Sequence, residues 1–147
     1  MGGTTIVIPC FNEERRLDAA SFRPLVDAPG CHLLFVDDGS VDGTLRVLRE
    51  ACALLGPKAS VLALEKNQGK AEAVRRGLLA AMEAGATVIG YLDADLATPP
   101  PEMLRLVKIV SEGAAQVALG SRVALLGRRI ERKPSRMGMR SRASAAA

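Results

Sequence analysis

The sequence predicts an α/β fold with a mostly parallel sheet that is covered by helices on both faces. Three observations lead to this prediction. Short apolar runs rich in β-branched residues alternate with segments whose apolar residues recur at helical spacing. The runs are almost continuously apolar, which is typical of parallel strands buried on both faces. Polar clusters follow four of the runs, and ligands of such sheets bind at the carboxyl ends of the strands.

Five segments have the composition of strands. We expect Pro9 to stop the first, because proline lacks a backbone N–H donor. The second and the fourth lead directly into aspartates, and the fifth is short. The expected strands are residues 4–9, 31–36, 60–64, 87–92 and 116–120.

Helices are expected between these strands. The first is interrupted near Pro24, and Asp42 or Ser40 is suited to cap the second. Gly85 ends the third, and Pro100 begins the fourth, since proline is tolerated in the first turn. The expected helices are residues 13–26 in part, 43–55, 70–84 and 100–111.

Composition divides the chain near residue 122. The 147 residues are 48% hydrophobic, which is enough for one domain with a core. Residues 120–147 hold eight basic and one acidic side chain, about +7, whereas the preceding twelve basic and fifteen acidic residues give about −3. We expect residues 1–122 to form the folded unit and residues 123–147 a basic, flexible tail. Contact of this tail with anionic lipid and an unpartnered, solvated tail both stay open.

Several function classes lack their sequence signals. Three scattered cysteines and a single histidine predict neither a zinc site nor a Ser-His-Asp triad. Scattered, odd-numbered cysteines are typical of reduced thiols in a cytosolic protein. No apolar run reaches the roughly 18 residues of a membrane span, and no secretory leader is visible. Aromatics are only 3%, so binding of nucleic acid by base stacking is not expected. We therefore expect a cytoplasmic protein, at most peripheral to the inner face of the membrane.

The tripeptide Asp93-Ala94-Asp95 is the most informative motif. It directly follows the expected strand 87–92. Two carboxylates one residue apart can together bind Mg²⁺ or Mn²⁺, and the cation can then coordinate a diphosphate. Capping of the next helix is the alternative. It is disfavoured because carboxylates gathered at one edge repel each other without a cation.

Two other clusters are placed for ligand binding. In residues 37–40, an aspartate can accept hydrogen bonds from a base or ribose, and Gly39 can let a ligand approach the backbone. An ordinary turn with a helix cap stays open there. Residues 67–70 open a helix, where backbone N–H groups and Lys70 suit a diphosphate. An ordinary loop with a surface lysine is the alternative.

These residues resemble the inverting family 2 glycosyltransferases, which have a GT-A fold with a Rossmann-like sheet. The similarity spans about residues 4–132 and is greatest to dolichyl- and polyprenyl-phosphate sugar synthases. The matching segments are Ile6-Val7-Ile8-Pro9-Cys10-Phe11-Asn12-Glu13, Val36-Asp37-Asp38-Gly39-Ser40 with Asp42-Gly43-Thr44, Asn67-Gln68-Gly69-Lys70 with Ala73-Val74-Arg75-Arg76-Gly77, Leu92-Asp93-Ala94-Asp95, and Gly120-Ser121-Arg122.

The resemblance implies transfer of a sugar, with inversion, from a UDP-glucose or GDP-mannose type of donor to a polyprenyl or dolichyl phosphate. It implies Mg²⁺ or Mn²⁺ as cofactor, held by Asp95 and Asp93. It implies catalytic roles for Asp93, Asp95 and Arg122, with Arg122 facing the acceptor phosphate. By matched position, the nucleotide-sugar is bound by Pro9, Phe11, Asn12, Glu13, Asp38, Gly69, Lys70 and Asp93.

Two departures from the family pattern bear on activity. Some relatives have a further metal ligand where this chain has Ala97, which cannot ligate. Family catalytic domains are longer, at roughly 200 residues or more, so a truncated chain lacking most of the acceptor half is expected. An inactive remnant that only binds nucleotide is therefore an alternative. A D-x-D-x-T phosphatase is disfavoured, because its motif belongs to the first strand and requires threonine at 97. Binding of membrane or nucleic acid by the basic tail alone is a further alternative.

Overall fold

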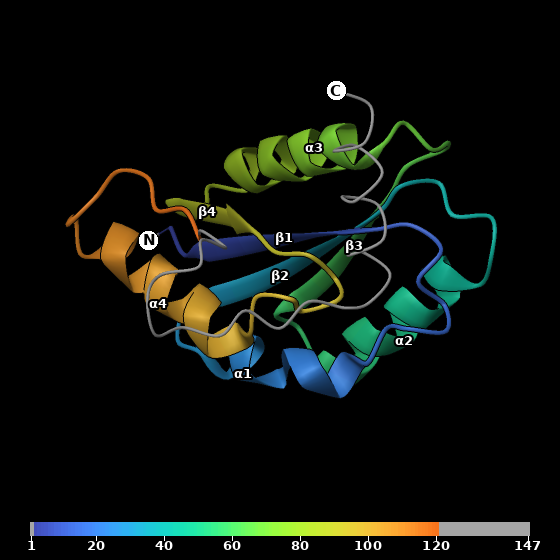
Figure 1. Ribbon diagram of the computed structural model, residues 1–147, viewed down its shortest axis with the longest axis horizontal. Helices are drawn as coiled ribbons and strands as arrows, with labels where there is room; N and C mark the ends of the chain where they lie inside the picture. Colours follow the sequence, from blue (N-terminus) through green and yellow to red (C-terminus); the bar gives the residue numbers. More distant parts are fainter. Residues whose placement is uncertain (1, 121–147) are drawn as a thin grey trace, which may run out of the picture.

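The computed structural model describes residues 2–120, in which a parallel sheet lies between two layers of helices (Figure 1). The sheet has the order β3-β2-β1-β4, and every neighbouring pair is parallel. Its strands are β1 (Thr4–Cys10), β2 (Cys31–Asp37), β3 (Ala59–Ala63) and β4 (Val88–Tyr91). The predicted parallel sheet is therefore confirmed for the described residues.

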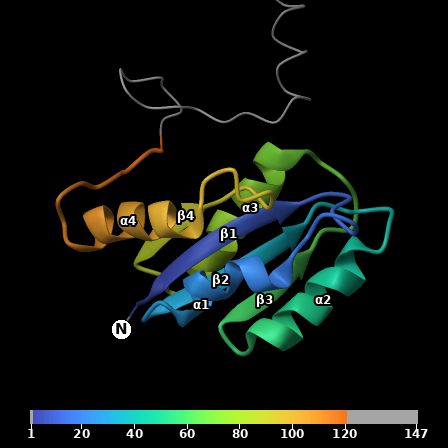
Figure 2. The same cartoon turned by 60° about the horizontal axis from the view of Figure 1, so that its bottom comes forward.

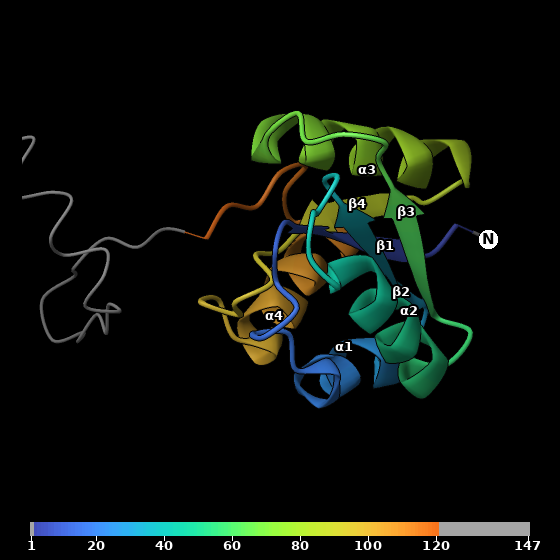
Figure 3. The same cartoon turned by 90° about the vertical axis from the view of Figure 1, so that its right-hand side faces the viewer.

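Helices cover both faces of this sheet. Helix α3 packs on one face, and α1, α2 and α4 lie on the other (Figure 3). The bounds are η1 (Ala19–Phe22), α1 (Arg23–Asp27), α2 (Thr44–Leu55), α3 (Lys70–Glu83) and α4 (Pro100–Ser111). Among residues 2–120, none of these helices combines the length and apolar content that crossing a bilayer requires.

Alternation along β1 divides the core between the two layers. Ile6 and Ile8 point into the cluster that includes Phe22 and Phe35, on the side of α1 and α2. Val7 points the other way, into the cluster with Val36 and Ala73 under α3. Such alternation is the pattern of a strand that is buried on both faces.

Glycine lets α3 approach the sheet closely. A Cβ added at Gly77 would lie 2.3 Å from Cγ1 of Val7 and 2.9 Å from Cγ2 of Val36. Both valines are fully buried, so they have no room to yield. The close packing fixes the position of α3, and hence of its first residue, Lys70.

The first strand does not stop at Pro9, as was predicted, but continues to Cys10. The carbonyl of Val7 accepts from Leu92 N at 2.9 Å, so Val7 points its backbone groups toward β4. Pro9, two residues on, points the same way, but β4 has ended at Tyr91. The missing N–H of Pro9 therefore costs no ladder hydrogen bond, and proline is tolerated there.

The first helical region is shorter than predicted. Residues 13–18 are not helical: residues 14–16 form a turn, and the Glu13 carbonyl accepts from Arg16 N and Leu17 N at 2.9 and 3.0 Å. Helical structure begins only at η1, where the Asp18 carboxylate accepts from Ala20 N at 3.1 Å. The side chain of Asp18 thus caps the start of η1. A hydrogen bond of this kind, from the local backbone to a side chain, competes with a helix that would continue through residue 18.

The predicted fifth strand, residues 116–120, is wrong: this segment is in no strand of the described structure. Val117 and Leu119 are 71% and 83% exposed. A strand needs a neighbour that supplies hydrogen bonds and apolar cover, and within residues 2–120 the segment joins neither edge of the sheet.

Candidate functional site

A cavity of about 470 Å³ opens at the carboxyl ends of the strands. The loops after β1, β2 and β3 gather at this end of the sheet (Figure 2). The volume is in the range of small-molecule sites. The lining residues come from the end of β1 and from the segments that follow all four strands: Pro9, Cys10, Phe11, Glu13, Arg16, Asp38, Asn67, Gly69, Lys70, Ala73, Asp93, Ala94 and Asp95.

The structure brings together most of the residues singled out from the sequence. Pro9, Phe11, Glu13, Asp38, Gly69, Lys70, Asp93 and Asp95 all line the cavity. Asn12 does not, and its polar groups bond to the neighbouring loop instead. Arg122 and the tail 123–147 lie outside the described residues.

Asp38 joins the end of β2 to the loop that begins α3. Its carboxylate is buried and accepts from Asn67 Nδ2 at 3.0 Å and from the backbone N–H groups of Gln68 and Gly69, each at 2.9 Å. A carboxylate has about four acceptor positions, so three are filled by the protein itself. Asp38 thus holds the loop that carries Lys70, and these three bonds leave one acceptor position of its carboxylate unfilled.

Gly39 has a structural role that was not predicted. A Cβ there would lie 2.3 Å from the backbone carbon of Lys66 and 2.4 Å from Asn67 N. Gly39 also has φ +61°, which favours glycine. The close approach that glycine permits is therefore between two segments of the chain, whereas the prediction was an approach by a ligand.

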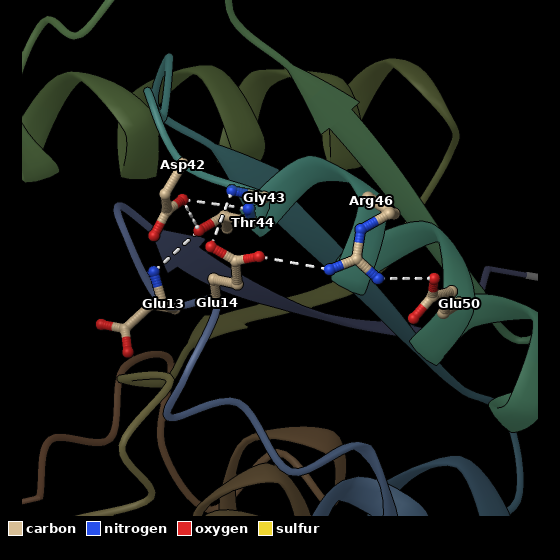
Figure 4. Close-up of polar contacts among 7 residues, drawn as sticks. All are labelled: Glu13, Glu14, Asp42, Gly43, Thr44, Arg46 and Glu50. Carbon is tan, nitrogen blue, oxygen red and sulfur yellow. Dashed lines mark hydrogen bonds and ion pairs between the residues drawn. The ribbon is translucent and has the colours of Figure 1, made fainter.

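Hydrogen bonds tie the loop after β1 to the loop after β2. Asn12 N donates to Ser40 Oγ at 3.0 Å, and Val41 N donates to Asn12 Oδ1 at 3.1 Å. Glu13 N donates to Thr44 Oγ1 at 2.8 Å (Figure 4). These bonds fix the backbone of the segment that presents Phe11 and Glu13 to the cavity.

Glu14 extends the same connection on the outer side. Its Oε2 accepts from Gly43 N at 3.0 Å, and its Oε1 lies 3.2 Å from Nη2 of Arg46, which also pairs with Glu50 at 2.8 Å (Figure 4). A Cβ at Gly43 would lie 2.2 Å from Glu14 Oε1, so a larger residue would displace this carboxylate. The network positions the start of α2 beside the first loop.

Asp42, one of the two residues predicted to cap α2, accepts hydrogen bonds at the start of that helix. Its Oδ1 accepts from both the backbone N–H and the hydroxyl of Thr44, although the residue directly before the helix is Gly43. The hydrogen bond from the Thr44 hydroxyl, followed by backbone hydrogen bonds, lowers the pKa of the Asp42 carboxyl. The buried Thr44 hydroxyl therefore serves Asp42 and Glu13 at once.

Replacing Thr44 with valine is expected to lower the free energy of unfolding by about 1–2 kcal/mol, because Glu13 N loses a buried acceptor. The pKa of Asp42 should rise toward its ordinary value. A carboxyl whose pKa is lower in the folded than in the unfolded protein stabilises the fold at pH values above its unfolded-state pKa. This stabilisation is lost as the pH falls through the folded-state pKa. The variant should therefore lose less stability on acidification. Urea denaturation at several pH values and NMR titration of Asp42 measure both effects.

Thr87→Val is the matched control, because the exposed Thr87 hydroxyl donates to the carbonyl of Gly2, far from these loops. It should change stability by less than about 0.5 kcal/mol. An unchanged titration of Asp42 in the Thr44 variant would contradict the conclusion that the Thr44 hydroxyl lowers the pKa of Asp42.

A strained turn places the two carboxylates after β4. Leu96 has φ +50°, a conformation that is costly for leucine, and its N–H donates to the Asp93 carbonyl at 3.0 Å. The Leu96 side chain packs against the apolar core, and Asp95 Oδ1 accepts from Ala97 N at 3.0 Å. Core packing and this short turn together direct Asp93 and Asp95 to the cavity.

The donor groups fit a divalent cation that is shared with a substrate. Among the described residues, no group of three or more His, Cys, Asp or Glu side chains could hold a metal alone. Mg²⁺ is commonly bound by one or two carboxylates together with substrate phosphates and water. Asp93 and Asp95 supply that number of carboxylates, so they suit a cation held jointly with a diphosphate.

Five residues of the cavity were not among the predicted site residues: Cys10, Arg16, Asn67, Ala73 and Ala94. Arg16 pairs with Glu13 Oε1 at 3.0 Å, and its position three residues after Glu13 is the signal that could have shown it. Cys10 also lines the cavity, but burial, followed by the nearby Glu13 and Asp37 carboxylates, raises the pKa of its thiol. A neutral, buried thiol is a poor nucleophile, so Cys10 serves packing.

Comparison with curated proteins shows related transferases. The chain is 36% identical over 113 residues to the undecaprenyl-phosphate 4-deoxy-4-formamido-L-arabinose transferase of Aeromonas hydrophila, covering 74% of this chain and 34% of that protein. It is 35% identical over 120 residues to the polyprenol monophosphomannose synthase of Mycolicibacterium smegmatis, covering 81% and 44%. The chain thus spans about a third to under a half of these relatives.

Solved structures share the fold. Staphylococcus aureus TarS 1–349 in complex with UDP has a TM-score of 0.65 at 20% identity, over 88% of this chain and 38% of that one. The mannosyltransferase PcManGT of Pyrobaculum calidifontis, in complex with GDP-Man and Mn²⁺, has a TM-score of 0.51 at 23% identity, over 63% and 27%. Structural neighbours of this kind are GT-A glycosyltransferases, so the predicted fold class is confirmed.

The family model for glycosyl transferase family 2 matches residues 5–144, which is most of the chain. The match includes β2, β3, β4, all of β1 except Thr4, and every residue that lines the cavity. The chain belongs to glycosyl transferase family 2.

Proposed function

We propose that this chain binds a nucleotide-sugar and transfers the sugar, with inversion, to a polyprenyl phosphate. One observation carries the proposal: the polar ends of four parallel strands meet in a single cavity that contains two carboxylates suited to a cation. The names of the curated relatives support the acceptor class, because they specify transfer to undecaprenyl or polyprenol phosphate. The donor class is UDP-glucose or GDP-mannose, as the resemblance implied.

The proposed roles follow position in the cavity. Pro9, Phe11, Glu13 and Asp38 hold the nucleoside, with the exposed Phe11 ring available for contact with the base. Gly69 and Lys70, at the start of α3, face the diphosphate, because helix N-termini favour anions. Asp93 and Asp95 hold the cation. Asn12 acts indirectly, by fixing the loop that carries Phe11 and Glu13.

The proposed reaction is a direct displacement. An oxygen of the acceptor phosphate forms a bond to the anomeric carbon, and the bond from that carbon to the donor diphosphate breaks. The acceptor oxygen is already anionic, so no general base has to remove a proton. The cation, when bound, stabilises charge on the departing diphosphate. Lys70 adds positive charge on the same side, and Arg122 is proposed to orient the acceptor phosphate.

Contact with the membrane is part of the proposal only through the acceptor. A polyprenyl phosphate resides in a bilayer, and the basic segment 123–147 is suited to anionic lipid headgroups. This contact stays a prediction, as does a location at the inner face of the membrane.

Titration calorimetry with UDP and with GDP, each with and without Mn²⁺, tests donor binding by the full chain. We expect one of the two nucleotides to bind saturably and to bind more tightly with Mn²⁺. Transfer of radiolabelled sugar to a short polyprenyl phosphate tests the reaction. Binding without transfer would identify a nucleotide-binding chain that lacks transferase activity. A folded protein that binds neither nucleotide would exclude the proposal.

A further inference from the structure

The ammonium group of Lys70 pairs with Oδ1 of Asp93, across the cavity edge. The two residues are 23 positions apart and belong to different elements, because Lys70 begins α3 and Asp93 follows β4. Both line the cavity. Lys70 Nζ also lies 5.9 Å from the centre of the Tyr91 ring, a cation–π distance. The ammonium group of this partly exposed lysine therefore lies at the carboxylate end of the site.

This ion pair occupies one of the two carboxylates proposed to hold the cation. Of the two basic side chains among the described lining residues, Arg16 pairs with Glu13, and Lys70 pairs with Asp93. Asp38 is held by the loop 67–69 through hydrogen bonds. Lys70 is thus the side chain that neutralises Asp93 when no cation is bound.

We propose that Lys70 and the divalent cation compete for Asp93. In the nucleotide-free protein, Lys70 occupies the carboxylate. Two positive groups at one carboxylate repel each other, so Lys70 has to leave when the cation binds. Its flexible four-carbon stem and three rotatable donors allow it to turn to the donor diphosphate, next to the N-terminus of α3. This inference rests on the proposed function, because it takes Asp93 as a cation ligand and a diphosphate as the second partner.

The competition predicts that metal and nucleotide binding are coupled. Without nucleotide, Lys70 weakens cation binding because its contact with Asp93 must be broken. With nucleotide present, the released ammonium gains the diphosphate as a partner. Each ligand therefore raises the affinity for the other, and the two effects are equal by linkage. Through its alternative contacts with Asp93 and the diphosphate, Lys70 makes the site select the cation and the donor together.

The test is Lys70→Met, which keeps the length of the stem and removes the charge. Mn²⁺ affinity without nucleotide, measured by electron paramagnetic resonance, should rise about three- to fivefold, the range of a partly exposed ion pair. Affinity for the nucleotide at saturating Mn²⁺, measured by calorimetry, should fall about tenfold as a charged hydrogen bond is lost. Neither readout depends on turnover.

Lys66→Met is the matched control, because Lys66 is an exposed lysine of the same loop that does not line the cavity. It removes the same charge and should change Mn²⁺ affinity much less. Equal effects of the two variants, or a Lys70 variant that binds Mn²⁺ no better than the wild type, would overturn the inference.

The Asp95→Asn variant distinguishes a failure of the proposed competition from a failure of the proposed function. If Asp95→Asn weakens Mn²⁺ binding but Lys70→Met does not strengthen it, only the competition is wrong. If Asp95→Asn leaves Mn²⁺ binding unchanged, the proposed cation site is wrong, and the competition falls with it.

Discussion

Replacing Asp95 with asparagine is expected to reduce sugar transfer by about 10²–10³-fold, the usual cost of losing one group that stabilises developing charge. Mn²⁺ binding should weaken strongly, because a neutral amide oxygen attracts a divalent cation less than a charged carboxylate does. The fold should persist. The amide oxygen of asparagine can still accept the hydrogen bond from Ala97 N that Asp95 Oδ1 accepts at 3.0 Å. Initial rates of transfer and Mn²⁺ resonance spectra measure the two losses.

The control for this variant is Asp27→Asn, which changes an exposed carboxylate at the end of α1. It should transfer sugar at the wild-type rate. Nucleotide affinity measured without metal should also be unchanged in the Asp95 variant, since the nucleoside contacts are proposed elsewhere. An Asp95 variant that turns over normally would remove this residue from the cation site.

Replacing Asp38 with alanine is expected to have the largest effect on stability, about 3 kcal/mol, because three hydrogen bonds to a buried carboxylate are lost together. The N–H groups of Gln68 and Gly69 would lose their acceptor, and the loop before α3 would loosen. The start of α3, which carries Lys70, would then be held only by the packing of that helix on the sheet. Nucleotide affinity should therefore fall about tenfold or more, in addition to the loss of stability.

Urea denaturation and calorimetry with the nucleotide measure both effects of the Asp38 change. Asp38→Asn is a second variant that is less disruptive to packing. It retains shape, but its amide N–H₂ cannot accept from the loop, so it should lie between the wild type and alanine. Asp27→Ala, at an exposed position, should stay within about 0.5 kcal/mol of the wild type. Equal unfolding midpoints for Asp38→Ala and the wild type would refute the role of this carboxylate.

Most of the fold could be predicted because its elements depend on local patterns. The apolar runs and the helical periodicity identified four strands and their order along the chain. Two local predictions were wrong for non-local reasons. Pro9 lies within β1 because β4 has already ended beside it, and residues 116–120 form no strand because the sheet offers them no partner. Local composition does not indicate whether a neighbour is present.

The candidate site was predictable to a similar extent. Polar residues at strand ends identified the edge, because parallel strands present their carboxyl ends together. The partners of those residues were not predictable. Asp38 lines the cavity as expected, but the sequence did not show that it also bonds to a loop about thirty residues away, or that Gly39 accommodates that loop's backbone. The spacing of Arg16 from Glu13 is compatible with an ion pair, but only the folded turn shows that the pair forms at the cavity.

The sequence by itself determined which residues follow buried strands, and therefore that acidic, amide and basic groups would share one edge of a parallel sheet. Only the tertiary structure decided how these groups pair: Asp38 with the loop 67–69, Arg16 with Glu13, and Lys70 with Asp93. The physical reason is the separation along the chain over which the two kinds of interaction act. Strand and helix formation depend on the spacing of apolar residues within a few turns. Two of these pairings join segments 23 to 31 residues apart, and they form only after β2 and β4 take their places on either side of β1.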